Sequence, residues 1–220
     1  MYSRMILSFL IATTMTIPNT EAPQNTAGAT PEIRHFINTD KTVLLDVPYV
    51  NQVDNLPEDK KTEIRASACG PTAVTMALNY LGDERDLYSV IEKLPTSVYV
   101  RGQMFYNLYD AAKYFDKETV KIKRDAKTIF ETLKDGHPII MNIQNYNGFI
   151  GHAIVVVGIK NFDGIKADAL IAHDPFTKGY REFKYINERT LQQPEGHYNY
   201  IGILDPFYIV DPDDSNNDRI

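Results

Sequence analysis

The hydrophobic pattern of this chain changes period about halfway along, and this change limits the folds that the chain can adopt. In residues 71–81 the apolar side chains fall at i, i+1, i+4, i+5 and i+8, which is one face of an α-helix. Comparable spacing predicts further helices over residues 87–94, 104–115 and 126–133. The second half instead contains short apolar runs separated by Asn, Gly, Asp and Pro, at residues 138–143, 153–159, 169–172 and 200–204. Such runs are typical of consecutive strands in one sheet, so the order of elements predicts a two-layer α+β domain and not alternating βαβ units.

The chain is long enough for one full-sized domain, because it has 220 residues of which 43% are hydrophobic. We expect this domain to span residues 36–210. Near its start, Thr42–Val47 is β-branched and apolar and predicts a strand or an extended segment, whereas residues 51–67 are polar. The flanking segments are polar and rich in Pro or Asp, so residues 23–35 are expected to be a linker and residues 211–220 an acidic disordered tail.

The extreme N-terminus has the pattern of a secretory signal peptide. Arg4 precedes an apolar run over residues 5–17 that is too short to span a bilayer. We therefore expect residues 1–22 to be removed on export, with residues 1–29 as the alternative. The mature protein is then expected to be secreted or held in the cell envelope by bacterial-type export, with no stable membrane span. The competing interpretation is an N-terminal helix that is packed or disordered.

Charge and cysteine content exclude several kinds of site. Lys and Arg number 23 against 29 Asp and Glu, which gives a net charge of −6 and argues against nucleic-acid binding. The single cysteine, Cys69, cannot form an internal disulfide, and no Cys/His cluster has the spacing of a zinc site. No dinucleotide fingerprint is visible either, so neither a metal nor a cofactor is expected.

Cys69 stands directly before the predicted helix that starts at Pro71. Its sulfur should therefore lie at a helix N-terminus, where unpaired backbone N–H groups favour the thiolate over the thiol. Gly70 removes side-chain bulk beside it, so that a substrate could approach the backbone. The alternative is a small buried hydrophobe, but such a cysteine would more naturally occupy Ala73 or Ala77 on the apolar face of the helix.

A thiolate nucleophile needs a base that can also protonate the leaving group, and histidine is the usual choice. His152 follows Gly151 and opens the most apolar strand of the chain, where a polar ring is either anchored by a hydrogen bond or functional. The other histidines lie at the linker, in turns or at the end of a later strand: His35, His137, His173 and His197.

Asp174 follows the next predicted strand, which covers residues 169–172. If this strand pairs antiparallel with the strand that starts at His152, Asp174 comes to lie beside that histidine and can orient its ring. The alternative role is a turn residue before Pro175. His173 should point to the opposite face, because side chains alternate along a strand.

Four short sequence motifs follow one another along the domain. They are Asp46–Gln52 (DVPYVNQ), Ala68–Ala73 (ACGPTA), Gly151–Gly158 (GHAIVVVG) and His173–Pro175 (HDP). The set resembles the papain-fold cysteine peptidases related to the bacteriocin-processing, double-glycine peptidases, over about residues 43–205. This resemblance implies a papain-like α+β fold in which an N-terminal helical part packs on a C-terminal antiparallel sheet.

The resemblance also implies roles for individual residues. Cys69 matches the nucleophile, His152 the base and Asp174 the residue that orients the base. Gln52 matches the glutamine whose side-chain amide helps to form the oxyanion hole, and such an amide can donate to a developing oxyanion. The segment before the histidine, residues 145–148, is interpreted either as a substrate-facing loop or as a hairpin turn.

The leading functional interpretation is a secreted cysteine peptidase that acts on a peptide or protein through an acyl-enzyme intermediate. No ATP-binding or membrane-spanning segment is visible, so the substrate of the leader-processing transporters is not inherited. The same residues could serve an amidase, a deamidase or a transglutaminase-like acyl transferase, because a fold does not decide the acceptor. A non-catalytic secreted binding module is the third interpretation. The oligomeric state is left open.

Overall fold

A computed structural model describes residues 35–103, 107–148, 150–177, 179–193 and 200–213 of the chain. The α-helices in this part are α1 (Glu58–Ile64), α2 (Cys69–Tyr80), α3 (Leu87–Lys93) and α4 (Ala126–Lys134). Two short 3₁₀ helices, η1 (Leu108–Asp110) and η2 (Ala112–Phe115), follow α3. The predicted signal peptide, most of the predicted linker and residues 214–220 of the predicted tail lie outside the described residues.

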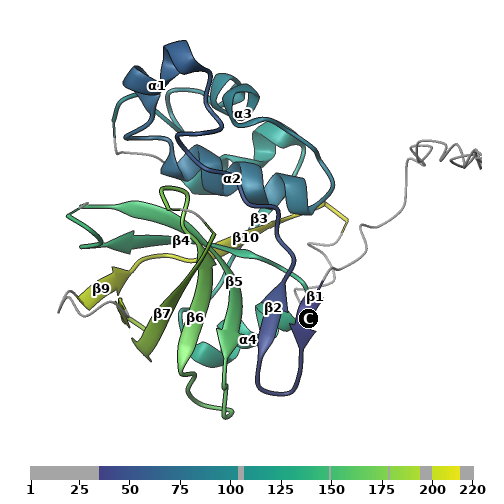
Figure 1. The fold of residues 1–220 in the computed structure, drawn as a ribbon. Coiled ribbons are helices and arrows are strands. Elements are labelled where there is room, and N and C mark those ends of the chain that lie inside the picture. The colour runs from purple at the N-terminus through teal and green to yellow at the C-terminus, as the bar shows by residue number, and fades with distance from the viewer. Residues whose placement is uncertain (1–34, 104–106, 149, 178, 194–199, 214–220) are drawn as a thin grey trace, which may run out of the picture. The chain divides into compact units, whose positions relative to one another are not determined.

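The strands form one antiparallel sheet that closes on itself. In chain order they are β1 (His35–Asn38), β2 (Val43–Leu45), β3 (Glu118–Lys121), β4 (Ile139–Gln144), β5 (His152–Lys160), β6 (Ala169–His173), β7 (Tyr180–Asn187), β8 (Thr190–Gln192), β9 (Tyr200–Ile203) and β10 (Phe207–Val210). Their order in the sheet is β1-β2-β5-β6-β7-β8-β9-β4-β10-β3. Because β4 also pairs with β5, the six strands from β5 through β9 to β4 make a closed ring. In Figure 1, α1, α2 and α3 lie together on one side of the strands.

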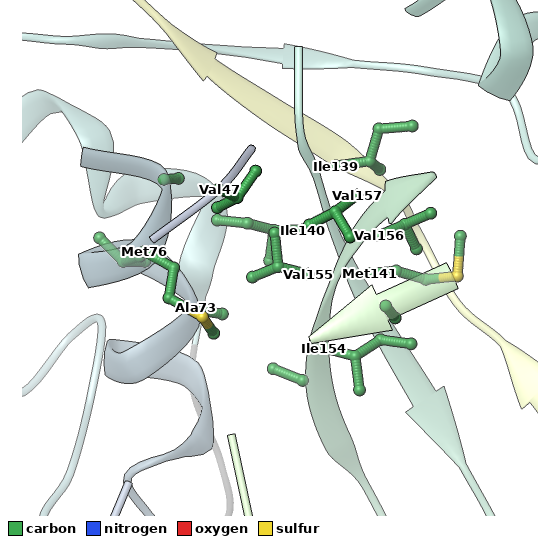
Figure 2. Packing of buried hydrophobic residues seen from close by; sticks show 14 of the residues in the cluster. Val47, Ala73, Met76, Ile139, Ile140, Met141, Ile154, Val155, Val156 and Val157 are labelled. Atoms are coloured by element: carbon green, nitrogen blue, oxygen red, sulfur yellow. The ribbon is translucent and has the colours of Figure 1, made fainter. Parts of the chain in front are cut away.

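The core is built where α2 packs on β5. Every residue of β5 before Lys160 is buried, because the strand has neighbours β2, β4 and β6 and is covered by α2. Figure 2 shows Ala73 and Met76 of α2 facing Ile140, Val155 and the adjacent apolar side chains. All four are fully buried. This packing fixes the start of α2 relative to the start of β5, which are the two places where the sequence predicts the nucleophile and the base.

Gly158 allows β2 to approach β5 closely. A Cβ atom at this position would lie 2.7 Å from the backbone oxygen of Val43, a separation that a backbone cannot relieve by a rotamer change. The pairing of β5 with β6 also shifts register between Val156 and Gly158, which marks a β-bulge. Gly158 is therefore required by the close approach of the two strands.

The helix ends follow the local sequence. Asp86 and Asp125 precede α3 and α4, and their side chains accept hydrogen bonds from the backbone N–H groups of Ser89 and Thr128 at 2.9 Å. After α2, Gly82 has φ of +83°, and its backbone N–H donates to the Asn79 oxygen at 3.2 Å. Predicted helices 71–81, 87–94 and 126–133 correspond to α2, α3 and α4 within two residues.

The predicted division into an N-terminal helical part and a C-terminal sheet needs correction. β1 and β2 precede all the described helices, and β2 pairs with β5 in the middle of the sheet. β1 also begins at His35, a residue assigned to the linker. The predicted helix over 104–115 is replaced, in its described part, by the 3₁₀ helices η1 and η2.

Candidate active site

Cys69 is the first residue of α2, as the sequence predicts. Ala68 precedes the helix without a side-chain cap, and its backbone oxygen accepts from the backbone N–H of Thr72 at 2.9 Å and from the Thr72 hydroxyl at 2.7 Å. These two bonds tighten the turn that carries the cysteine. Cys69 is buried, with 1% of its surface accessible. Burial alone suits a structural cysteine as well, so its neighbours decide its role.

The segment just before Cys69 is also fixed by polar contacts. The Ser67 hydroxyl donates to the Ile64 backbone oxygen at 3.1 Å and lies 2.8 Å from the Tyr99 hydroxyl. The same Ser67 oxygen accepts from the Gly102 backbone N–H at 3.0 Å. Burial raises the pKa of Tyr99, and the charge of Cys69 adds to this effect. The turn before Cys69 is therefore fixed by the side-chain hydrogen bonds of Ser67.

His152 is the first residue of β5 and is 3% exposed. Its Nε2 lies 2.8 Å from Asp174 Oδ1, and its side chain also hydrogen-bonds Cys69. Burial acts to lower the pKa of His152, but the hydrogen bonds with Asp174 and Cys69 and the charges of both outweigh it and raise the pKa to about 9. Because Nε2 faces the aspartate, Nδ1 is left for the thiol. A histidine with this pKa carries its proton at neutral pH.

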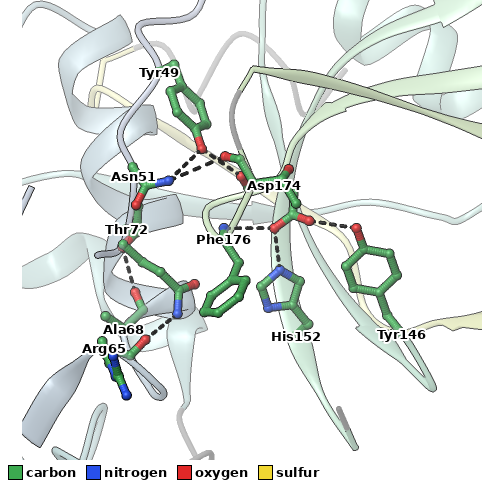
Figure 3. Close-up of polar contacts among 11 residues, drawn as sticks. Tyr49, Asn51, Arg65, Ala68, Thr72, Tyr146, His152, Asp174 and Phe176 are labelled. Atoms are coloured by element: carbon green, nitrogen blue, oxygen red, sulfur yellow. Dashed lines mark hydrogen bonds and ion pairs between the residues drawn. The ribbon is translucent and has the colours of Figure 1, made fainter. Parts of the chain in front are cut away.

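Asp174 follows β6 and is completely buried. Its Oδ1 accepts from His152 and from the Phe176 backbone N–H at 2.9 Å, and its Oδ2 accepts from the Tyr146 hydroxyl at 2.6 Å (Figure 3). Burial acts to raise the pKa of Asp174, but these bonds and the positive charge of His152 hold it below its usual value. The carboxylate is therefore charged and oriented towards the imidazole. β5 and β6 pair antiparallel, which is the arrangement that the sequence argument required.

Gln52 lies beside the turn that follows Asp174. Its backbone N–H donates to the Pro175 oxygen at 2.8 Å, and its side-chain Nε2 donates to the Arg65 oxygen. The Gln52 side chain is buried, and its Oε1 has no hydrogen-bond partner among the described residues. The described hydrogen bonds of Gln52 thus hold the residue in place, and none of them is made to the side chains of Cys69, His152 or Asp174. One N–H of the amide is used by Arg65, which leaves the second for another acceptor.

Tyr49 and Asn51 connect the Gln52 segment to the same turn. The Tyr49 hydroxyl donates to the Asp174 backbone oxygen at 3.0 Å and accepts from Asn51 Nδ2 at 3.2 Å (Figure 3). Asn51 Nδ2 also lies 3.4 Å from the Thr177 oxygen. Two segments more than a hundred residues apart in sequence are thereby joined at the site. Tyr49 and Asn51 belong to the first of the four sequence motifs, but their contacts could not be inferred from it.

Tyr146 is a site residue that sequence reasoning missed. It lies in a turn where Asn145 and Asn147 have φ of 60° and 49°, and it is 1% exposed. The Tyr146 side chain points inward to Asp174 and not to solvent, while the two interpretations of residues 145–148 as a loop or a hairpin turn stay predictions. Its ring also stacks on His152, with centroids 5.5 Å apart and an angle of 19° between the planes. A lone tyrosine between two asparagines gives no sequence signal for this role.

His173 lies outside the site, as strand alternation predicts. Its Nε2 lies 2.9 Å from the Val47 backbone oxygen, and its ring stacks on Tyr180 at 4.6 Å between centroids. Burial lowers the pKa of His173. His137 stacks on Tyr208 of β10, and His197 lies outside the described residues.

The residues that the structure describes contain no group of three or more His, Cys, Asp or Glu side chains placed to hold a metal ion. Among the helices that the structure describes, none combines the length and the apolar character needed to cross a membrane.

Comparison with known proteins bears on this geometry. A sequence model described as the Peptidase_C39 like family matches residues 44–206. This range contains Gln52, Cys69, His152 and Asp174. A search of curated proteins found no match.

Proposed function

Because the chain belongs to the Peptidase_C39 like family, we propose that it is a peptidase in which Cys69, His152 and Asp174 form a catalytic triad. Membership supports an enzyme of the cysteine-peptidase type that acts on a peptide or protein substrate. One observation supports the finer assignment most strongly. It is the continuous series of polar contacts from the Cys69 thiol through His152 to the buried Asp174 carboxylate.

In the proposed acylation step, the Cys69 thiolate attacks the carbonyl carbon of the scissile peptide bond. A C–S bond forms and the carbonyl electrons move to the oxygen. As the tetrahedral intermediate collapses, the C–N bond breaks and His152 gives its proton to the leaving amine. A raised His152 pKa supports this step, because the ring already carries the proton at neutral pH.

Deacylation reverses the role of the imidazole. Neutral His152 takes a proton from water as the water oxygen attacks the thioester carbon, and collapse of this second intermediate releases the carboxylic acid and the thiolate. Asp174 remains ionised throughout and holds the ring by its 2.8 Å contact. The triad thus returns to its starting protonation state.

The oxyanion is proposed to be stabilised from two sides. The first backbone N–H groups of a helix have no intrahelical acceptor, and Cys69 is the first residue of α2. The second donor is the buried Gln52 side-chain amide. Its Nε2 donates to the Arg65 backbone oxygen, and the Gln52 backbone N–H donates to the Pro175 oxygen. Both donors are fixed before substrate arrives, which is the condition for effective electrostatic stabilisation.

The proposed activity is tested by incubating the protein with a diverse peptide mixture and identifying the products by mass spectrometry. We expect new free carboxyl termini at internal peptide bonds, because the proposed deacylation transfers the acyl group to water. The matched control is the same protein with its single thiol alkylated, which should give no products. Release of ammonia without chain cleavage would indicate a deamidase, and joined peptides would indicate an acyl transferase; either outcome contradicts the peptidase proposal.

We also propose that the protein is exported. The support is Arg4 followed by the apolar run over residues 5–17, which lies outside the described residues. N-terminal sequencing of protein recovered from outside the cytoplasm should begin at residue 23 or residue 30. Recovery of soluble cytoplasmic protein that still begins with Met1 contradicts this proposal.

A further inference from the structure

We propose that Tyr146 and Arg181 are positioning residues that fix the Asp174 carboxylate and, through it, the orientation of His152. This inference rests on the proposed triad and extends it by two residues that lie behind the aspartate. The series of contacts then runs from Arg181 on β7 through Tyr146 and Asp174 to His152 and Cys69.

The two oxygens of the Asp174 carboxylate have different donors. Oδ1 accepts from His152 Nε2 and from the Phe176 backbone N–H. Oδ2 accepts from the Tyr146 hydroxyl at 2.6 Å, and the carboxylate has no exposed surface. A buried carboxylate oxygen without a donor costs free energy, so the tyrosine hydroxyl is what satisfies this side of the charge. Two donors on one oxygen and one on the other prevent rotation of the carboxylate about its Cβ–Cγ bond.

The Tyr146 hydroxyl has one hydrogen to donate, and Arg181 determines where it goes. Arg181 hydrogen-bonds the Tyr146 side chain. A guanidinium group carries only donors, so it must donate and the phenol oxygen must accept. The single hydroxyl hydrogen of Tyr146 is therefore left for Asp174 Oδ2. Burial and the Asp174 charge raise the pKa of Tyr146, so the hydroxyl keeps this hydrogen.

The Tyr146 ring contacts His152 directly. The two rings stack at 5.5 Å with 19° between their planes. The Tyr146 ring also meets the Phe183 ring edge-on, with centroids 5.7 Å apart and 65° between the planes. Arg181 and Phe183 are two apart on β7 and so project from the same face of that strand. One strand thus holds both the ring and the hydroxyl of Tyr146, and Tyr146 contacts both members of the His–Asp pair.

The test uses Tyr146→Phe, which removes the hydroxyl and keeps the ring. We expect kcat to fall about tenfold with little change in KM, because the change acts on a base used in the transition state. The titration midpoint of Asp174, followed by carboxyl ¹³C NMR, should rise because a bond that stabilises the carboxylate is lost. This second measurement needs no substrate.

Tyr185→Phe is the matched control. Tyr185 is also a buried tyrosine, and its hydroxyl donates to the Arg124 backbone oxygen at 2.8 Å, away from the triad. It should lower thermal stability by a similar amount and leave both kcat per folded molecule and the Asp174 midpoint unchanged. If Tyr146→Phe behaves like this control, the positioning role is overturned.

Arg181→Ala tests the outer residue and does not depend on whether Tyr146→Phe folds. It should lower kcat by less than Tyr146→Phe, because the hydroxyl remains but is free to rotate. Adding Arg181→Ala to Tyr146→Phe should cause no further loss, since arginine acts through that hydroxyl. Fully additive losses would contradict a series arrangement. A wild-type protein without turnover but with the expected rise of the Asp174 midpoint in Tyr146→Phe would refute the proposed function and leave the positioning role supported.

Discussion

Replacement of Cys69 by alanine should lower peptide turnover by roughly four orders of magnitude or more, because no other group in the proposed mechanism can form the acyl-enzyme. The chain contains no second cysteine that could substitute for it. The change removes one buried sulfur atom from the start of α2, so the cost in folding free energy should be on the order of 1 kcal/mol. Turnover and thermal melting, measured on the same preparations, separate loss of the nucleophile from loss of the fold. Substantial residual cleavage by pure Cys69→Ala protein would exclude Cys69 as the nucleophile.

The same variant has an effect on His152 that does not depend on any substrate. The hydrogen bond and the charge of Cys69 both help to raise the pKa of His152 to about 9. In Cys69→Ala these contributions are absent, so the pKa measured by NMR should be lower than in the wild type. Cys69→Ser provides an intermediate control, because a hydroxyl can hydrogen-bond the ring but does not ionise in this range. An unchanged His152 pKa in Cys69→Ala would show that the two side chains do not interact.

The elements that place Cys69 and His152 could be predicted because their sequences carry local signals. α2 has apolar residues at helical spacing, a proline near its start and a glycine after its end. β5 is a continuous apolar run, which reflects a strand buried on both faces. These signals depend on residues close in sequence. They placed Cys69 at a helix start and His152 at a strand start, where the structure has them.

Other elements lacked such signals for identifiable reasons. α1 buries one of its residues, Ile64, so it has no apolar periodicity to detect. β7 buries Phe183 and Tyr185, while its other side chains are exposed or half-buried because its second face is open to solvent. The 3₁₀ helices occupy a stretch whose spacing also suits an α-helix, and local packing decides between them. In each case the tertiary environment, and not the local sequence, selects the structure.

Some contacts of the candidate site could likewise be predicted from the sequence, and others could not. The proximity of Asp174 to His152 follows from antiparallel pairing of β5 with β6, which the short connection between them made predictable. The roles of Tyr146 and Arg181 depend on β7 lying next to β6 in the closed sheet. No pattern near Tyr146 reports on that neighbour. Contacts between non-adjacent segments therefore required the structure.

Asp174→Ala should lower kcat by about 100-fold or more and change KM much less, because the aspartate orients and stabilises a protonated base. The variant leaves His152 buried without its carboxylate partner. Burial, which acts to lower the pKa of His152, is then opposed by Cys69 alone. In the wild type, kcat/KM should fall as pH rises through about 9, where His152 loses its proton. In Asp174→Ala this alkaline decline should begin at a lower pH.

The difference in thermal stability between the wild type and Asp174→Ala should depend on pH, and the pKa shifts of His152 and Asp174 determine how. The native pKa of His152, about 9, lies above its ordinary value of 6.5, so protonation stabilises the fold. This contribution is complete below pH 6.5 and is lost as pH rises through about 9. The lowered pKa of Asp174 adds stability that is present above its ordinary value and lost in acid. The gap in thermal stability between wild type and Asp174→Ala should therefore be widest near neutral pH and narrow in both directions.

His173→Ala is the matched control for Asp174→Ala, because the two residues are adjacent, buried and hydrogen-bonded. His173 bonds the Val47 backbone oxygen and stacks on Tyr180, so its loss should lower thermal stability. It should leave kcat per folded molecule and the alkaline decline of kcat/KM close to wild type. If Asp174 were only a turn residue before Pro175, both variants would lose stability and keep kcat. Loss of turnover in His173→Ala together with normal turnover in Asp174→Ala would instead mean that His173, and not Asp174, serves the base.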